Sequence, residues 1–153
     1  MKSKVIPVAE LFVGWVRETT GANDGPWVEA IQRTTGNKKG DAWCASFVNF
    51  VLDIAFKDQN PLPCSASCDV LLEFARAHNM LTTDPAPGDV FLVMKTPTDA
   101  THTGIVTSVD KDLIRTIEGN TNREGAREGN GVWARVRKRT GLLFISVPFA
   151  AKT

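Results

Sequence analysis

The sequence predicts an α+β domain in which helices occupy the first half of the chain and an antiparallel sheet occupies the second. Apolar residues recur at helical spacing before about residue 80, and short apolar or alternating runs typical of strands follow after about residue 90. Two of these later runs are separated by a short polar segment typical of a hairpin. Helices followed by strands, without alternation, favour α+β over a parallel α/β fold. Because 153 residues is an ordinary length for one domain, residues 1–153 are expected to form a single domain.

The first two helices are placed by their prolines and apolar spacing. Pro7 suits the first turn of a helix. The apolar face of this helix would consist of Val8, Leu11, Phe12, Trp15 and Val16. Pro26 begins a second, short helix, and Gly36 is a plausible stop just beyond it.

The third and fourth helices carry the cysteines. Asp41 is a good N-cap for a helix over 43–56, which is apolar almost all round and is therefore expected to be the buried central helix. Ser65 or Ser67 can cap a fourth helix that ends near Asn79.

The strands are expected from alternation and from short apolar runs. The predicted strands are 90–94, 102–109, 113–120, 132–136 and 142–149. A three-residue loop at 110–112 would join the second and third of them as a hairpin. The glycine-rich segment 121–131 is expected to be a loop.

Composition excludes several classes of protein. With 42% hydrophobic and 23% charged residues, the chain is neither disordered nor fibrous. A net charge of +1 gives no electrostatic support for a nucleic-acid partner. No apolar run approaches the roughly 20 residues that a membrane span needs. Pro7 and Glu10 interrupt the apolar stretch near the N-terminus, so the protein is expected to be made in the cytoplasm without a signal peptide.

The three cysteines do not form the pattern of a disulfide scaffold, because their number is odd and low. The spacing of Cys64 and Cys68 matches no common zinc signature, so no metal and no cofactor are expected. Packing, or a strained local disulfide between these two residues, is the simpler interpretation.

Cys44 and His102 are the candidate nucleophile and base. Cys44 is expected in the first turn of the central helix, where partial positive charge and free N–H groups stabilise a thiolate and a developing oxyanion. The alternative is a buried structural cysteine. His102 begins a predicted strand and is the natural base for a thiol, although a half-exposed strand histidine is the alternative.

The hairpin brings further groups to His102. With the three-residue loop, Val109 pairs with Leu113, and the same register sets His102 opposite Asn120. Glu118 lies two residues before Asn120 and shares its face of the sheet, within side-chain reach of the imidazole. A slip of one residue would turn both to the other face. A carboxylate or amide on Nδ1 would leave Nε2 facing the thiol.

These residues resemble the CHAP family, the cysteine, histidine-dependent amidohydrolases/peptidases, a branch of the papain-like cell-wall hydrolases related to NlpC-type enzymes. The matching stretches, in family order, are VRETTGANDGPWVEAIQRTTG, GDAWCASFV, PAPGDVFLV, HTGIVTSVD and IEGNTN. The resemblance implies a papain-like α+β fold with the nucleophile-bearing helix packed on the C-terminal sheet. It assigns Cys44 as nucleophile, His102 as base, Glu118 as the third member and Asn120 as the polar residue that assists.

The resemblance also implies a function. We expect thiol-dependent hydrolysis of a peptidoglycan amide bond, as an N-acetylmuramoyl-L-alanine amidase or a stem-peptide or cross-bridge endopeptidase. Phage endolysins and interbacterial toxins of this family act in this way, after release through a holin or a secretion system. A monomer is expected, with an inhibitory immunity protein as a partner if the chain is a toxin. The alternatives are a papain-like peptidase or transferase acting on protein, and a silent domain that binds wall fragments.

Other residues are expected near the cleft or away from it. Trp43, Arg123 and Arg127 are expected to line the oxyanion and substrate cleft. The basic run 135–139 is expected to be a solvated strand edge, with contact to an anionic wall polymer as the lesser alternative. Asp89 follows a Pro-Gly turn and is expected to be a turn residue.

Overall fold

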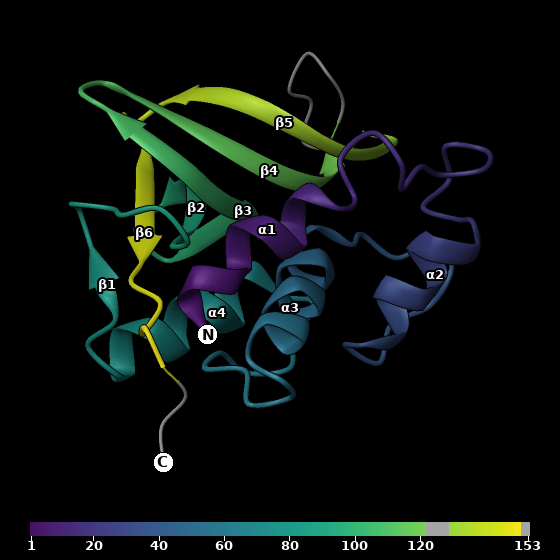
Figure 1. Cartoon of the computed structure of the whole chain (residues 1–153), viewed down its shortest axis with the longest axis horizontal. Helices are drawn as coiled ribbons and strands as arrows, with labels where there is room; N and C mark the ends of the chain where they lie inside the picture. Colours follow the sequence, from purple (N-terminus) through teal and green to yellow (C-terminus); the bar gives the residue numbers. More distant parts are fainter. Residues whose placement is uncertain (122–128, 151–153) are drawn as a thin grey trace.

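The computed structural model of the chain describes residues 1–121 and 129–150 and confirms the predicted α+β class (Figure 1). The helical elements are η1 (Lys2–Lys4), α1 (Val5–Glu10), α2 (Pro26–Arg33), α3 (Cys44–Ala55) and α4 (Cys68–Ala77). The strands are β1 (Leu81–Thr82), β2 (Val90–Thr96), β3 (Asp99–Asp110), β4 (Leu113–Thr121), β5 (Gly131–Lys138) and β6 (Leu142–Ile145).

The strands form one antiparallel sheet in the order β1-β6-β2-β3-β4-β5. Helices α1, α3 and α4 contact β3, and α3 also contacts β4, so the helices share one side of the sheet (Figure 1). The two-residue strand β1 was not predicted, because it is too short to show a pattern. The last strand ends at Ile145 rather than at residue 149.

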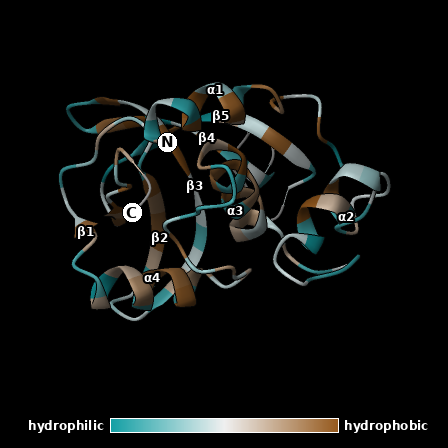
Figure 2. Cartoon of the chain, turned by 60° about the horizontal axis from the view of Figure 1, so that its bottom comes forward, coloured by the Kyte–Doolittle hydropathy of each residue, from teal (hydrophilic) through white to brown (hydrophobic). Residues whose placement is uncertain are grey.

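Helix α3 is the buried centre of the fold, as its apolar sequence predicts (Figure 2). It packs closely on β4 at Gly119. A Cβ added to Gly119 would lie 2.5 Å from the Cβ of Phe47 and 2.9 Å from Cζ3 of Trp43. Real Cβ atoms do not approach so closely, so the glycine allows the N-terminal end of the helix to lie against the sheet. This contact brings the cysteine end of α3 to β4.

The N-terminal helix is shorter than predicted. It ends at Glu10, and Gly14 follows with a φ of +71°. The chain then runs along the edge of the sheet, where the N–H of Gly14 donates to the carbonyl of Val132. As a result Leu11 and Trp15, expected on the packed face, are 70% and 59% exposed.

Asp89 is a structural anchor rather than a simple turn residue, which corrects the expectation from the sequence. Its side chain is buried and accepts hydrogen bonds from Lys2 Nζ at 2.5 Å, Ala86 N at 2.8 Å and Val147 N at 2.9 Å. The carboxylate therefore ties the N-terminal segment, the start of β2 and the C-terminal segment together.

The sheet carries a second, smaller apolar cluster besides the main core under the helices. It consists of Phe91, Val106, Ile114 and Phe144. Within residues 1–121 and 129–150, no helix is long and apolar enough to cross a membrane.

Candidate active site

Cys44 is the first residue of α3, in the position that the sequence predicts. The residue is 7% exposed, and the N-cap residue before it is Trp43. The N–H groups of a first helical turn have no partner within the helix and point toward any group bound there. Local sequence therefore places the thiol where positive partial charge and free donors meet.

His102 and Glu118 meet across β3 and β4. The Nε2 atom of His102 donates to Oε1 of Glu118 at 2.8 Å, and both side chains are buried. The pair is the one that the hairpin register predicts, although the structure reaches it differently.

The hairpin loop has two residues rather than three, because Asp110 pairs with Leu113. Alone, this change would shift the register by one residue and turn Glu118 to the other face. A β-bulge between Val106 and Ser108 restores the predicted register, so that Ile105 pairs with Ile117. The bulge is therefore the feature that aims Glu118 at His102.

The imidazole is turned the opposite way from the prediction. Glu118 occupies Nε2, not Nδ1. Nδ1 of His102 is buried and makes no hydrogen bond to the part of the chain that the structure describes. Cys44 and His102 nevertheless interact strongly enough to shift each other's pKa. Nδ1 is thus the ring nitrogen that Glu118 leaves without a partner among the described residues.

Arg137 is a candidate site residue that the sequence analysis missed. It donates to both carboxylate oxygens of Glu118, through Nε to Oε2 at 2.6 Å and through Nη2 to Oε1 at 2.7 Å. Its guanidinium also lies 5.4 Å from the ring centre of Phe91. The expectation of a solvated edge is therefore wrong at this residue, which is only 19% exposed in its side chain.

At Val136 and Arg137 the faces of β5 are the reverse of what its apolar residues suggest, whereas Val132 near the start of the strand is buried as expected. Val136 is 49% exposed, whereas Arg137 reaches inward to Glu118. The buried acid on the neighbouring strand was the available signal, since a fully buried carboxylate needs a cationic partner or strong donors.

Glu118 is surrounded by donors. Thr116 Oγ1 donates to Oε2 at 2.6 Å, in addition to the bonds from His102 and Arg137. Burial alone would raise the pKa of this carboxyl, but Arg137 and His102 outweigh burial and lower the pKa to about 2. Glu118 is therefore a permanent negative charge behind the imidazole.

Cys44 and His102 each favour the charged form of the other. The pKa of Cys44 lies well below its ordinary value, first because of the hydrogen bond from Cys68, and also because of His102, against the effect of burial. Burial would lower the pKa of His102, but Cys44 and Glu118 outweigh it and raise the pKa to about 9. Both pKa shifts favour a thiolate beside an imidazolium.

Cys68 completes this group and was not expected there. It is the first residue of α4, capped by Ser67, and its Sγ lies 3.8 Å from Sγ of Cys44. All three cysteines are free, so the alternative of a local disulfide with Cys64 is not observed. Cys64 is exposed and its Sγ donates to the carbonyl of Thr34 at 3.0 Å.

Of the other predicted site residues, two are buried and two lie outside the part of the chain that the structure describes. Asn120 is buried with a φ of +55°, and its Oδ1 makes no hydrogen bond to the described residues. Trp43 is fully buried, with Nε1 donating to Glu18 Oε1 at 2.9 Å, so its indole does not line a cleft as expected. Arg123 and Arg127 lie outside the described residues.

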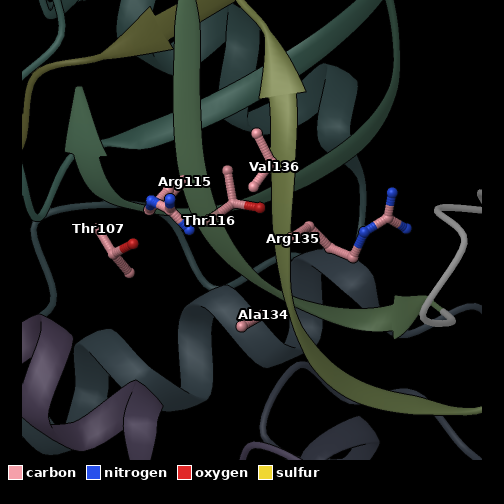
Figure 3. A pocket seen from close by; sticks show the side chains of 6 residues that line it. All are labelled: Thr107, Arg115, Thr116, Ala134, Arg135 and Val136. Carbon is pink, nitrogen blue, oxygen red and sulfur yellow. The ribbon is translucent and has the colours of Figure 1, made fainter. Parts of the chain in front are cut away.

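The sheet carries an open depression that does not include the predicted site residues. An open pocket of about 450 Å³ is lined by β3, β4 and β5, but none of its lining residues is a predicted site residue (Figure 3). Among the residues that the structure describes, no group of three or more His, Cys, Asp or Glu side chains could hold a metal ion.

The chain has a papain-like α+β fold, with a cysteine at the start of the central helix and a histidine on the antiparallel sheet. The chain belongs to the CHAP family, because the family model described as CHAP domain matches residues 35–120, more than half of its length.

A solved structure, described as the crystal structure of Ly7917, has a similar fold. The TM-score is 0.57 at 13% sequence identity, with 95% of this chain and 62% of that chain covered. The present chain therefore spans less than two thirds of that protein. No curated protein matches the sequence.

Proposed function

We propose that the protein hydrolyses an amide bond of peptidoglycan through the thiolate of Cys44. The observation that carries the proposal is the buried His102–Glu118 pair, together with Cys44 at the start of α3, whose pKa is lowered by Cys68 and by His102. These residues supply a nucleophile, a proton carrier and a fixed countercharge, which are the three parts of a thiol acyl-transfer site.

The reaction would follow two steps. The Cys44 thiolate attacks the carbonyl carbon, and N–H groups of the first turn of α3 donate to the oxyanion. Nδ1 of His102 gives its proton to the leaving amine, and a thioester remains on Cys44. Nδ1 then takes a proton from water, whose oxygen attacks the thioester and releases the acid. Glu118 stays ionised throughout and stabilises the imidazolium by charge.

The proposed function includes the bond that is cleaved and the setting in which the protein acts. The bond is either the N-acetylmuramoyl-L-alanine amide or an amide of the stem peptide or cross-bridge. The protein would act on the cell wall as a monomer, in phage lysis or in attack on other bacteria, and a toxin would have an immunity protein. A protein-directed cysteine peptidase or transferase and a silent wall-binding domain are the competing functions.

Digestion of purified peptidoglycan, followed by mass spectrometry of the fragments, tests the proposal. A new amino terminus on L-alanine would identify an amidase, and a new terminus within the peptide would identify an endopeptidase. Cys44→Ala should release no fragments, whereas Cys64→Ala, which changes an exposed thiol outside the site, should retain activity. Fragment release by Cys44→Ala at a near wild-type rate would refute the mechanism. Cleavage of protein but not peptidoglycan would favour the first competing function.

A further inference from the structure

Two cysteines begin two different helices and bring their sulfur atoms together. Cys44 is the first residue of α3 and Cys68 is the first residue of α4, and their Sγ atoms lie 3.8 Å apart. The two residues are 7% and 8% exposed. A mechanism of amide hydrolysis requires only the first of these thiols as a nucleophile. The second donates a hydrogen bond to it and has no covalent role in that mechanism.

We infer that Cys68 is a resolving thiol, which forms a reversible disulfide with Cys44 after peroxide oxidises the nucleophile. A disulfide requires the sulfur atoms to approach to about 2.0 Å. From 3.8 Å this is a movement within the reach of side-chain rotation, and both thiols are free to make it. A low-pKa thiolate with a resolving cysteine beside it is the arrangement of a redox-sensitive thiol.

The chemistry balances with hydrogen peroxide as the oxidant. The Cys44 thiolate attacks one peroxide oxygen, the O–O bond breaks, and hydroxide leaves and takes a proton to become water. Cys44 is then a sulfenic acid. The Cys68 sulfur attacks the Cys44 sulfur, the S–O bond breaks, and a second water leaves with the Cys68 proton. Two electrons have passed from the two thiols to the peroxide.

The order of these steps follows from the charges. While Cys44 is a thiolate, its hydrogen bond with Cys68, together with burial, raises the pKa of Cys68 and keeps that thiol protonated. Oxidation turns Cys44 into a neutral sulfenic acid and removes the charge. Cys68 then lies at a helix N-terminus with its proton no longer held by an anion, so it becomes the attacking group.

The disulfide would act as an off state that protects the nucleophile. It blocks attack on any substrate and prevents further oxidation to the irreversible sulfinic acid. A dithiol reductant would restore both thiols by exchange. The consequence for lysis rests on the proposed function, whereas formation of the bond does not.

The experiment uses the Cys64→Ser variant, because Cys64 is exposed and would add intermolecular disulfides. The protein is treated with hydrogen peroxide, digested without reductant and examined by mass spectrometry. We expect a linked peptide pair containing Cys44 and Cys68, lighter than its two thiol parts by two hydrogens. Thiol titration after denaturation should fall from two groups to none. Lysis of peptidoglycan should be lost and should largely return with dithiothreitol.

A Cys64→Ser/Cys68→Ser variant provides the comparison. After peroxide, Cys44 in this variant should gain two oxygens, and dithiothreitol should not restore its activity to the value before treatment. If the Cys64→Ser protein shows the same irreversible oxidation and no linked peptides, Cys68 is not a resolving thiol. Linked peptides in a protein that never lyses peptidoglycan would support the disulfide and refute only the proposed function.

Discussion

Nε2 of His102 lies 2.8 Å from Oε1 of Glu118, and a single β-bulge makes this contact possible. The hairpin turn by itself sets a register that would place the two side chains on opposite faces of the sheet. The extra residue between Val106 and Ser108 shifts the register back. Bulges near active sites re-aim side chains in this way.

Inhibitors should separate thiol chemistry from metal chemistry. Iodoacetamide should abolish lysis because it alkylates the Cys44 thiolate. EDTA should leave the rate unchanged, since no metal is expected from the sequence. The fall in turbidity of a cell-wall suspension measures the rate of lysis in the presence of each inhibitor. Loss of activity in EDTA that zinc restores would contradict the thiol mechanism, whereas restoration by calcium would indicate a structural ion.

Glu118→Gln and Asn120→Ala should have different effects. The first removes the charge behind His102, so the pKa of the imidazole should fall and the rate should drop by about 10²–10⁴-fold, by analogy with loss of a triad carboxylate. The second removes a side chain whose Oδ1 makes no hydrogen bond to the described residues, so only ring orientation should loosen. Ultraviolet titration of the thiolate measures the difference. A curve that moves for Asn120→Ala alone would show that the third member is wrongly assigned.

Arg137 should act as a positioning residue through Glu118. Arg137→Gln removes two hydrogen bonds and a countercharge from a fully buried carboxylate, so the pKa of Glu118 should rise and stability should fall by about 3–5 kcal/mol. Arg137→Lys keeps the charge without the forked geometry and should have an intermediate effect.

Lys138→Gln changes the exposed neighbour on β5 and is the matched control for Arg137. Denaturant unfolding measures stability, and the pH profile of kcat reports the imidazole, which a purely structural role would leave in place. If Arg137→Gln has the wild-type unfolding free energy and the wild-type pH profile of kcat, the ion pair of Arg137 with Glu118 neither stabilises the fold nor affects His102.

Activity should depend on pH through the thiolate–imidazolium pair. The pair exists above the lowered pKa of Cys44 and disappears as pH rises through about 9, where His102 loses its proton. The profile of kcat/KM should therefore fall on the alkaline side near that value. In Glu118→Gln this limb should move to lower pH, because one of the charges that raise the pKa of His102 is gone. An alkaline limb unchanged by Glu118→Gln would contradict the assignment of that limb to His102.

The buried pair of Lys2 and Asp89 should stabilise the fold without affecting catalysis. Asp89→Ala leaves the Lys2 ammonium, 6% exposed, without its partner and removes the acceptor for two backbone N–H groups. Unfolding free energy should fall by about 3–5 kcal/mol, measured by denaturant titration. Asp84→Ala, at an exposed position, is the control and should change little. If Asp89→Ala and Asp84→Ala have the same free energy of unfolding, the contacts of Asp89 make no net contribution to stability.

The sequence alone carries much of the fold and of the site. The apolar helix over 43–56, the Ser67 cap and the strand starting at Val90 are local patterns, because they depend on residues a few positions apart. Cys44 at a helix start follows from the same kind of spacing. The opposition of His102 to the Glu118 strand face was expected from a three-residue turn, whereas the structure reaches it with a two-residue turn and a β-bulge that the spacing does not predict. A family resemblance then joins these residues into one site.

Tertiary structure decided which further side chains reach that site. Cys68 lies beside Cys44 because two helices pack against β3, and Arg137 faces Glu118 because β5 turns its basic residue inward. The orientation of the His102 ring, with Nε2 toward Glu118, also depends on contacts between strands. Spacing along a chain specifies periodicity and local caps, whereas distances between elements arise only when burial and charge pairing are satisfied together in one packed structure.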